Sequence, residues 1–281
     1  MKAVITAAGL GKRFMTASKA VPKEMLPVID KPVIQYVVEE ARAASVDEVI
    51  IVTNDNKPSI KIHFAEDDEL ISILESKGYD EAAYKVREVV ALQPTFVTQE
   101  EQIGLGNAVL CAHDLVVNSE NELFYLLLGD IVVPEMSILP RLLEVSNAHG
   151  GASVIAVLQV PDHEVKRFGV VKGIDLTEHG EAGVWRVTGL EEKPQVIPPP
   201  SNMAIFGRYL LTTKLFELLE VTEIGVSKEV QLTDALNLLL EHDELYALII
   251  DPTDGYDVGT VESWLKANIQ LALKLPGFSF T

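Results

Sequence analysis

Short runs of apolar residues alternate with helical spacing along the first half of the 281-residue chain, and this alternation limits the fold most strongly. Four runs are almost continuously apolar: KAVIT (2–6), EVIIVT (48–53), TFVT (95–98) and LFYLLLGD (123–130). Such strands belong to a sheet that is covered on both faces. Helical spacing lies between them, at 32–44, in pieces over 57–91, and at 104–114. We therefore predict an α/β fold: a Rossmann-like, mostly parallel central sheet with helices on both faces.

The second half of the chain is less regular. A helix is expected over 136–149, followed by a buried strand at ASVIAVL (152–158). GVVKGID and GVWRVTGLEEKP are typical of an antiparallel piece, and MAIFGRYLL and YALIID of further strands. Helices are expected over 213–220, 231–241 and 260–273. Because no linker separates the halves, we predict one domain that contains a small antiparallel part.

Positive charge is concentrated near the amino end of a chain whose formal net charge is −19. Residues 1–31 hold six basic side chains, Lys2, Lys12, Arg13, Lys19, Lys23 and Lys31, against only Glu24 and Asp30. A sequence pI of about 4.7 argues against nucleic acid as a partner, because polyanion binding needs a basic face. The pattern instead indicates a local site for a small anion.

Cys111 is the single cysteine, so an internal disulfide is excluded and a zinc site would lack thiolates. This usage favours a reducing compartment. The segment MKAVITAAG is too short for the apolar region of a signal peptide, and no run of about 18 apolar residues occurs. We expect a cytoplasmic protein with no membrane partner.

The loop AAGLGKRF (7–14) directly follows the first strand. It lacks the third glycine of a dinucleotide fingerprint and the GK[ST] of a Walker loop. Gly9 and Gly11 would let backbone N–H groups approach an anion closely, and Arg13 adds a charged fork. A tight turn without a ligand is the alternative. The basic residues that follow the loop, Lys19 and Lys23, favour a phosphate ligand over an empty turn.

The stretch AAGLGKRFMTASKAVPKEMLPVIDKPVIQYVVEEA resembles the amino-terminal signature of the sugar-1-phosphate nucleotidylyltransferases, and in particular their bacterial uridylyltransferase branch. The likeness spans the chain through GLGNAVLCA, LLLGDIV, RFGVV, LEEKP, NMAIFGRYLL, KEVQLTDAL and YDVGT. It implies a catalytic domain over 1–259, with a nucleotide-binding part at about 1–135 and a sugar-binding part at about 136–259. Residues 260–281 would form a C-terminal helix and tail that can contact another subunit of a homo-oligomer, a dimer or a tetramer.

The resemblance implies transfer of a uridylyl group from UTP to glucose 1-phosphate, with release of pyrophosphate. Such a step depends mainly on charge neutralisation and in-line positioning. By similarity, Arg13 holds the departing phosphates, Lys23 reaches the α-phosphate or the sugar phosphate, and Lys193 holds the sugar phosphate. The alternative is that these are solvated surface cations. Ala7, Ala8, Gly9 and Gly11 would supply the loop backbone.

Two carboxylates are expected at the phosphates. Asp130 ends a strand at the edge where open α/β sheets bind ligands, and Asp257 lies in the turn GYDVGT. The resemblance implies that the pair holds Mg²⁺, which usually keeps several waters and so needs few protein ligands. For Asp257 the alternative is a helix N-cap ahead of 260–273. Asp130 could also be a simple turn residue.

The remaining site residues also come from the resemblance. Gln99 would read the pyrimidine edge, because an amide both donates and accepts, and Gly104 would pack against the base. The predicted sugar pocket comprises Gly169, Glu192, Lys193, Asn202 and Glu229. Loop glycines and a surface glutamine are the structural alternatives.

Two other functions stay open on the sequence alone. One is a thymidylyltransferase for the same sugar phosphate, since a pocket separates bases that differ by a methyl group by only about 1–3 kcal/mol. The other is a non-catalytic relative that binds sugar nucleotides, which the retained Arg13, Asp130, Lys193 and Asp257 disfavour.

Overall fold

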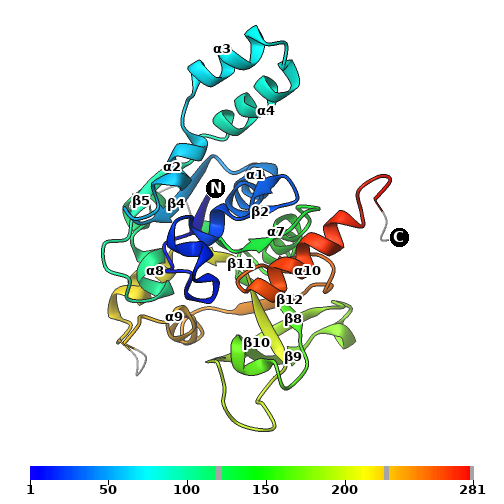
Figure 1. Ribbon diagram of the computed structural model, residues 1–281. Helices are drawn as coiled ribbons and strands as arrows, with labels where there is room; N and C mark the ends of the chain where they lie inside the picture. Colours follow the sequence, from blue (N-terminus) through cyan, green and yellow to red (C-terminus); the bar gives the residue numbers. More distant parts are fainter. Residues whose placement is uncertain (118–121, 225–227, 279–281) are drawn as a thin grey trace.

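The computed structural model describes residues 1–117, 122–224 and 228–278; the end of the predicted tail, residues 279–281, lies outside this part. A nine-stranded mixed sheet forms its centre, in the order β5-β4-β1-β6-β11-β8-β12-β10-β9 (Figure 1). The strands are β1 (Lys2–Thr6), β4 (Glu48–Thr53), β5 (Thr95–Thr98), β6 (Leu123–Leu128), β8 (Ser153–Gln159), β9 (Gly169–Asp175), β10 (Val184–Glu192), β11 (Met203–Thr212) and β12 (Leu245–Ile249).

Parallel pairing dominates the first half of the sheet, as predicted. β5 pairs with β4, β4 with β1 and β1 with β6, all in parallel. β8 and β12 form a further parallel pair. The predicted Rossmann-like sheet with a small antiparallel part is thus confirmed.

Helices cover both faces of this sheet. One face carries α1 (Val33–Ala43), α2 (Pro58–Phe64) and α7 (Ile138–Ala148), and the other carries α5 (Leu105–Leu110), α6 (His113–Val116), α8 (Lys214–Val221) and α9 (Leu232–Leu239). Side chains of β1 alternate between the two resulting cores: Ala3 and Ile5 enter one, and Val4 enters the other. This is why Ala3, Val4 and Ile5 are all apolar although they face opposite sides of the sheet.

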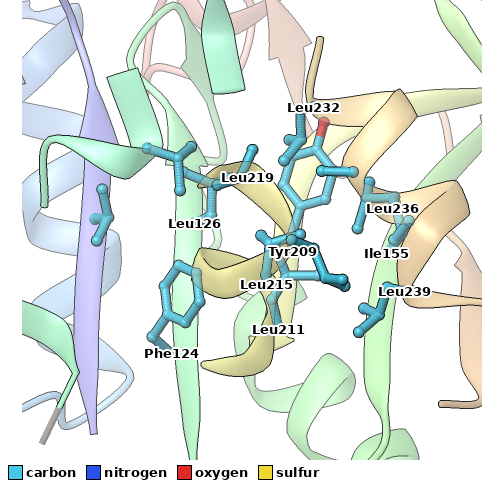
Figure 2. Close-up of a cluster of buried hydrophobic side chains, with 14 of the residues drawn as sticks. Phe124, Leu126, Ile155, Tyr209, Leu211, Leu215, Leu219, Leu232, Leu236 and Leu239 are labelled. Carbon is cyan, nitrogen blue, oxygen red and sulfur yellow. The ribbon is translucent and has the colours of Figure 1, made fainter. Parts of the chain in front are cut away.

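The core beneath α8 and α9 joins the two halves of the chain. Figure 2 shows Phe124 and Leu126 of β6, Tyr209 and Leu211 of β11, and Ile155 of β8 beside leucines of the two helices. Because residues from both sides of position 135 share this core, the sheet and its packing continue across the boundary expected between the nucleotide and sugar parts.

The antiparallel strands are placed differently from the sequence-based expectation of a separate piece. β9 and β10 extend one edge of the main sheet, whereas β11 lies in its middle, antiparallel to both β6 and β8. The register of β11 against β8 shifts between Ile205 and Tyr209, around Gly207 with φ +76°. The first part of β11 also meets β9, through Ala204 and Val170. Bulges of this kind often lie beside functional sites.

Smaller elements surround the carboxyl edge of the sheet. After β1 the chain runs through three short 3-10 turns (Lys12–Phe14, Ala17–Lys19 and Lys23–Met25) and the ribbon β2 (Pro27–Val28)–β3 (Lys31–Pro32). β7 (Ile131–Val132) pairs with β13 (Tyr256–Asp257). The helices α3 (Asp68–Ser76) and α4 (Asp80–Ala91) form a hairpin that projects from the body (Figure 1).

The last helix, α10 (Val261–Ala272), begins with a capping box in which Thr260 and Ser263 bond each other's backbone N–H. Asp257 is therefore not its N-cap. Across the described ranges, none of the helices has the length and apolar character to span a membrane.

Candidate active site

The carboxyl ends of β1, β5 and β6 open onto a cleft of about 910 Å³. This is the edge at which open α/β sheets bind ligands. Thirteen of the predicted residues line it: Ala8, Gly9, Gly11, Arg13, Lys23, Gln99, Gly104, Asp130, Gly169, Glu192, Lys193, Glu229 and Asp257. The structure therefore brings together residues that are up to 249 positions apart in the chain, from Ala8 to Asp257.

The loop that follows β1, residues 7–14 (the anion loop), is shaped for backbone approach. A Cβ at Gly9 would meet no atom within 4 Å, so its backbone is open to the cleft. Gly11 has φ +63°, and its carbonyl accepts a hydrogen bond of 2.9 Å from Ser18 Oγ. Phe14 is buried and anchors the end of the loop. The open backbone at Gly9 is compatible with the predicted approach of an anion.

Two polar side chains that sequence reasoning missed hold the start of this loop. Lys57 Nζ donates to the Ala7 carbonyl at 2.7 Å, and Asn54 Nδ2 donates to the Ala8 carbonyl at 2.7 Å. Lys57 also forms a buried ion pair with Glu24 at 2.9 Å. Ala7, the first residue of the loop, is buried and does not line the cleft.

Asp130 and Asp257 face each other across one small space. A Cβ built on Gly259 would lie 2.8 Å from Asp257 Oδ1, 2.9 Å from Arg13 Nη2 and 3.1 Å from Asp130 Oδ2. The β7–β13 ribbon brings the two acids together, because Asp257 pairs with Ile131, the residue after Asp130. In addition, Val258 N donates to the Asp130 carbonyl at 2.9 Å.

The two acids differ in their electrostatics. Burial alone would raise the pKa of Asp130, but its ion pair with Lys23 and the nearby Arg13 lower it overall. For Asp257, burial and the negative charge of Asp130 raise the pKa. The pKa of Lys23 is raised as well, since Asp130 and Glu24 outweigh the effect of its burial. Cations thus outweigh the effect of burial at Asp130, whereas Arg13 and Arg167 offset it only in part at Asp257.

These residues fit a hard divalent cation. Two carboxylates meet at one point, and the charge on Asp257, which Arg13 and Arg167 offset only in part, is what a bound cation would relieve. Among the described residues, no group of three or more His, Cys, Asp or Glu could enclose a metal ion. A pair of carboxylates suits Mg²⁺, which keeps several of its waters and is completed by substrate phosphates.

Gln99 lies at the end of β5, beside the first turn of α5. Its Nε2 donates to Asn107 Oδ1 at 2.7 Å and to the Gly104 carbonyl at 3.2 Å. Gly104 has φ +113°, and a Cβ there would lie 2.6 Å from the Val230 carbonyl oxygen. The glycine therefore permits close packing against residues 229–230, whatever ligand lies nearby.

The far end of the cleft is built from the antiparallel edge. Gly169 begins β9 and pairs with Glu192, which ends β10. Glu192 Oε1 accepts a 2.5 Å bond from Lys193 Nζ, and Thr233 Oγ1 donates to Glu192 Oε2 at 3.4 Å. Glu229 accepts a 3.0 Å bond from Gln231 Nε2. This end presents acidic oxygens and one lysine around a bare backbone position.

One predicted sugar-pocket residue is not in this cleft. Asn202 lines a second pocket of about 640 Å³, together with residues 158–162 and 249–252. Its carbonyl accepts a 3.0 Å bond from Val160 N, so it joins the start of β11 to the end of β8. The placement of Asn202 is the one sugar-side expectation that the geometry does not support.

Sequence reasoning also missed cations at the junction of the two ends. Lys166 and Arg167, on the turn before β9, line the cleft, and Arg167 Nη2 lies 4.0 Å from Asp257 Oδ2. The segment KRFG could have indicated them, because Lys166 and Arg167 come just before Gly169, which the sequence analysis assigned to the sugar pocket. Gln102 lines the cleft near Gln99 and was missed as well.

In a comparison with known protein families, residues 2–273 of the chain match a family model described as nucleotidyl transferase. A UTP–glucose-1-phosphate uridylyltransferase of Staphylococcus haemolyticus is 42% identical over 278 residues, which cover 98% of this chain and 93% of that protein. A UTP-bound UGPase from Acinetobacter baumannii superposes with a TM-score of 0.85 at 37% identity, over 98% of this chain and 94% of that one. A UDP-glucose pyrophosphorylase complexed with UDP-glucose gives a TM-score of 0.82 at 34% identity, over 98% and 99% of the two chains.

Proposed function

The chain belongs to the nucleotidyl transferase family, and from this premise we infer that it transfers a uridylyl group from UTP to glucose 1-phosphate, giving UDP-glucose and pyrophosphate. The observation that carries this inference is 42% identity over nearly the whole chain to a relative with that activity. The cleft agrees with it, because it joins a cationic anion loop to an acidic, glycine-lined pocket.

In this reaction a phosphate oxygen of glucose 1-phosphate attacks the α-phosphorus of UTP, a new P–O bond forms, and the bond to the β-phosphate oxygen breaks. Several negative charges must be held close together during this exchange. The main task of the protein is therefore to neutralise charge and to align the two substrates.

We propose that the anion loop and its neighbours hold the nucleotide phosphates. The open backbone at Gly9 and the left-handed turn at Gly11 direct N–H groups to the β- and γ-phosphates, and Arg13 neutralises them as they depart. Lys23 reaches the α-phosphate. The support is that both cations lie beside Asp130, in the same corner of the cleft as the loop.

We propose that Asp130 and Asp257 hold Mg²⁺. When bound, the ion neutralises phosphate oxygens and helps to align the transferring group. Lys23 keeps Asp130 ionised, and the amide N–H of Gly259 orients Asp257 through a 2.7 Å hydrogen bond. The support is the convergence of the two carboxylates and the charge on Asp257, which the neighbouring cations offset only in part.

For recognition of the base and the sugar, Gln99 reads the uracil edge and Gly104 packs against the ring. Glu192 accepts hydrogen bonds from sugar hydroxyls, Gly169 lets the ring lie on the backbone, and Lys193 holds the sugar phosphate. Glu229 lines the same cleft beside Gly104, where it can meet a sugar hydroxyl. Asn202 is not assigned a role in the cleft, because it lines the second pocket.

The reaction is tested by mixing the protein with Mg²⁺, UTP and glucose 1-phosphate and following pyrophosphate release, with mass spectrometry of the product. UDP-glucose is expected. Replacing UTP by dTTP in a competition assay measures the preference for uracil over thymine. A higher kcat/KM with dTTP, or no pyrophosphate with any nucleotide, would contradict the uridylyl assignment.

We propose that the protein assembles as a homo-oligomer through α10. Val261, Leu265, Ile269 and Leu273 recur every four residues and are 55, 51, 37 and 51% exposed, so they form one apolar stripe on the outer face of the helix. A second copy of the chain would cover it. Light scattering should give a multiple of the monomer mass that falls on Leu265→Glu substitution; a monomeric wild type contradicts the proposal.

We also propose a cytoplasmic location. Its support is the single, half-buried Cys111, which needs no oxidising compartment. Cell fractionation with antibody detection tests it, and recovery in a membrane or secreted fraction would overturn it.

A further inference from the structure

Among the residues that the structure describes, Arg208 has the largest fully buried side chain, and it lies directly behind the loop that carries Asp130. We propose that Arg208 is a positioning residue for this reaction: it holds residues 128–131 (the acid loop) so that the Asp130 carboxylate points into the cleft. This inference rests on the proposed role of Asp130 as a metal ligand. It concerns a side chain that touches neither substrate nor metal.

The guanidinium of Arg208 clamps the acid loop on both sides of Asp130. Nη1 donates to the Leu128 carbonyl at 3.2 Å, and Nη2 donates to the Ile131 carbonyl at 2.8 Å. These carbonyls lie two residues before and one residue after Asp130. Since Arg208 pairs with Leu127 in the β11–β6 ladder, its side chain is fixed relative to the end of β6.

Glu40 of α1 sets the orientation of the guanidinium. Its carboxylate accepts bonds from Arg208 Nε at 3.0 and 3.1 Å and from Nη2 at 2.8 Å, and neither side chain is exposed. The remaining donor edge of the guanidinium is thereby directed at the acid loop. A planar fork can satisfy both partners at once, whereas a lysine ammonium cannot reproduce this geometry.

The loop needs an external clamp because it turns sharply at a crowded point. Gly129 N donates to the Thr6 carbonyl at 3.0 Å, and a Cβ at Gly129 would lie 2.7 Å from that same oxygen. The chain must therefore leave β6 at Gly129, place Asp130 in the cleft, and enter β7 at Ile131. Arg208 ties the two strand ends that flank this turn.

Stabilisation of the fold alone does not explain the buried Arg208–Glu40 ion pair. Replacing a buried ion pair by apolar residues of similar volume is often neutral or stabilising, because both charges lose their hydration when buried. Five bonds to Glu40, the Leu128 carbonyl and the Ile131 carbonyl instead specify one position for the acid loop. Partners that orient metal ligands typically change metal affinity 10–100-fold when they are removed.

The test compares two variants with a matched control. Arg208→Lys keeps the charge but loses the fork, and the double variant Arg208→Met/Glu40→Leu removes both buried charges, so that it folds even if the single variant does not. Leu239→Ala is the control, because Leu239 is buried in the core under α9 and does not line the cleft. Folding of each is checked by circular dichroism and thermal denaturation.

The primary readout is Mn²⁺ binding, measured by calorimetry and electron paramagnetic resonance without glucose 1-phosphate, so that no turnover occurs. We expect affinity to fall at least tenfold in both Arg208 variants and to stay within twofold of wild type in Leu239→Ala. In assays, the Mg²⁺ concentration for half-maximal rate should rise by a similar factor, while KM for glucose 1-phosphate changes less than threefold.

Asp130→Asn separates failure of this inference from failure of the metal assignment. If Asp130→Asn loses Mn²⁺ binding and the folded Arg208 variants keep it, Arg208 does not position the acid loop and the inference is overturned. If Asp130→Asn itself binds Mn²⁺ as wild type does, the metal role of Asp130 is wrong, and the inference that depends on it falls with it.

Discussion

The supporting ion pairs at the two ends of the cleft differ in how deeply they are buried. At the nucleotide end, the supporting ion pairs are buried: the side chains of Lys57 and Glu24 are 8 and 1% exposed, and those of Arg208 and Glu40 are 0% exposed. At the sugar end, Lys193 and Glu192 are 55 and 27% exposed. Charges held in a low-dielectric surround interact strongly and are fixed before substrate arrives, whereas exposed pairs are screened and can rearrange.

The difference follows from where each end lies in the sheet. The anion loop and the acid loop leave β1 and β6, which are central strands covered by helices on both faces. Gly169 and Glu192 lie on β9 and β10, at an edge. Phosphate transfer demands preorganised charge, and a sugar can be held by groups that adjust around it. Substitutions at the nucleotide end should therefore lower activity more than similar substitutions at the sugar end.

The largest effect is expected for the two acids. Asp130→Asn and Asp257→Asn should each lower kcat about 10³-fold, because the proposed metal site loses a charged ligand. Their effects on stability should differ in sign, and thermal denaturation at pH 7 in the presence of EDTA measures this.

The opposite signs follow from the two pKa shifts. The pKa of Asp130 is lowered, so its charge stabilises the fold above its unfolded pKa, and that contribution is lost as pH falls through its folded pKa. The pKa of Asp257 is raised, so its charge is unfavourable at pH 7 and is relieved as pH falls. Asp130→Asn should lower Tm and Asp257→Asn should raise it, each by about 2–4 °C. Shifts of equal sign would refute the contrast between the acids.

A glycine substitution gives the next largest effect. In Gly259→Ala the new methyl group would lie 2.8 Å from Asp257 Oδ1 and 2.9 Å from Arg13 Nη2. Asp257 Oδ1 is held by a 2.7 Å bond from the Gly259 N–H, and Asp130, whose Oδ2 would lie 3.1 Å from the methyl group, is paired with Lys23. Because the two acids cannot give way without leaving their positions, we expect kcat to fall about 10²-fold with circular dichroism unchanged. A loss below fivefold would mean that the acids and Arg13 move freely, and that the nucleotide end is not preorganised.

These contrasts also explain what the sequence could predict. Gly9, Gly11, Arg13 and Asp130 follow strands that are recognisable from apolar runs, so local pattern placed them correctly at the carboxyl edge of the sheet. The parallel half of the fold and nearly all helices were predicted for the same reason.

Residues that act from behind the site could not be found in this way. Lys57 reaches Ala7 from the residue before α2, and Arg208 reaches Ile131 from β11, 77 positions away in the chain. Both contacts depend on the order of strands, and nothing local in the sequence indicates that β11 lies in the middle of the sheet. Asn202 was placed with the sugar pocket by motif likeness, although the start of β11 turns it toward the second pocket.

At the sugar end, removal of a charge should have a moderate effect. Lys193→Ala should lower kcat/KM for glucose 1-phosphate about 10-fold, since a charge-assisted bond is worth about 1.5–3 kcal/mol and this one is half exposed. KM for UTP should change little. Lys172→Ala is the matched control, because Lys172 pairs with Glu191 at 3.5 Å on the same edge and does not line the cleft. Equal losses in both variants would assign the effect to the edge and not to the substrate.

The smallest effect is expected for Gly169→Ala, the counterpart of Gly259→Ala. The new methyl group would lie 3.0 Å from Glu192 Oε2 and 3.1 Å from Ile205 Cδ1 and Thr233 Cγ2, all ends of side chains. These atoms can give way, so we expect KM for glucose 1-phosphate to rise about fivefold, or about 1 kcal/mol, with kcat nearly unchanged.

Gly189→Ala, whose methyl group would meet only Lys172 Cε at 3.6 Å, is the control for a methyl group added to the same edge, and its kinetics should match the wild type. If Gly169→Ala instead lowers kcat as much as Gly259→Ala does, the sugar end is as rigid as the nucleotide end. In that case, burial of the supporting ion pairs would not explain how far the side chains at each end of the cleft can shift without loss of activity.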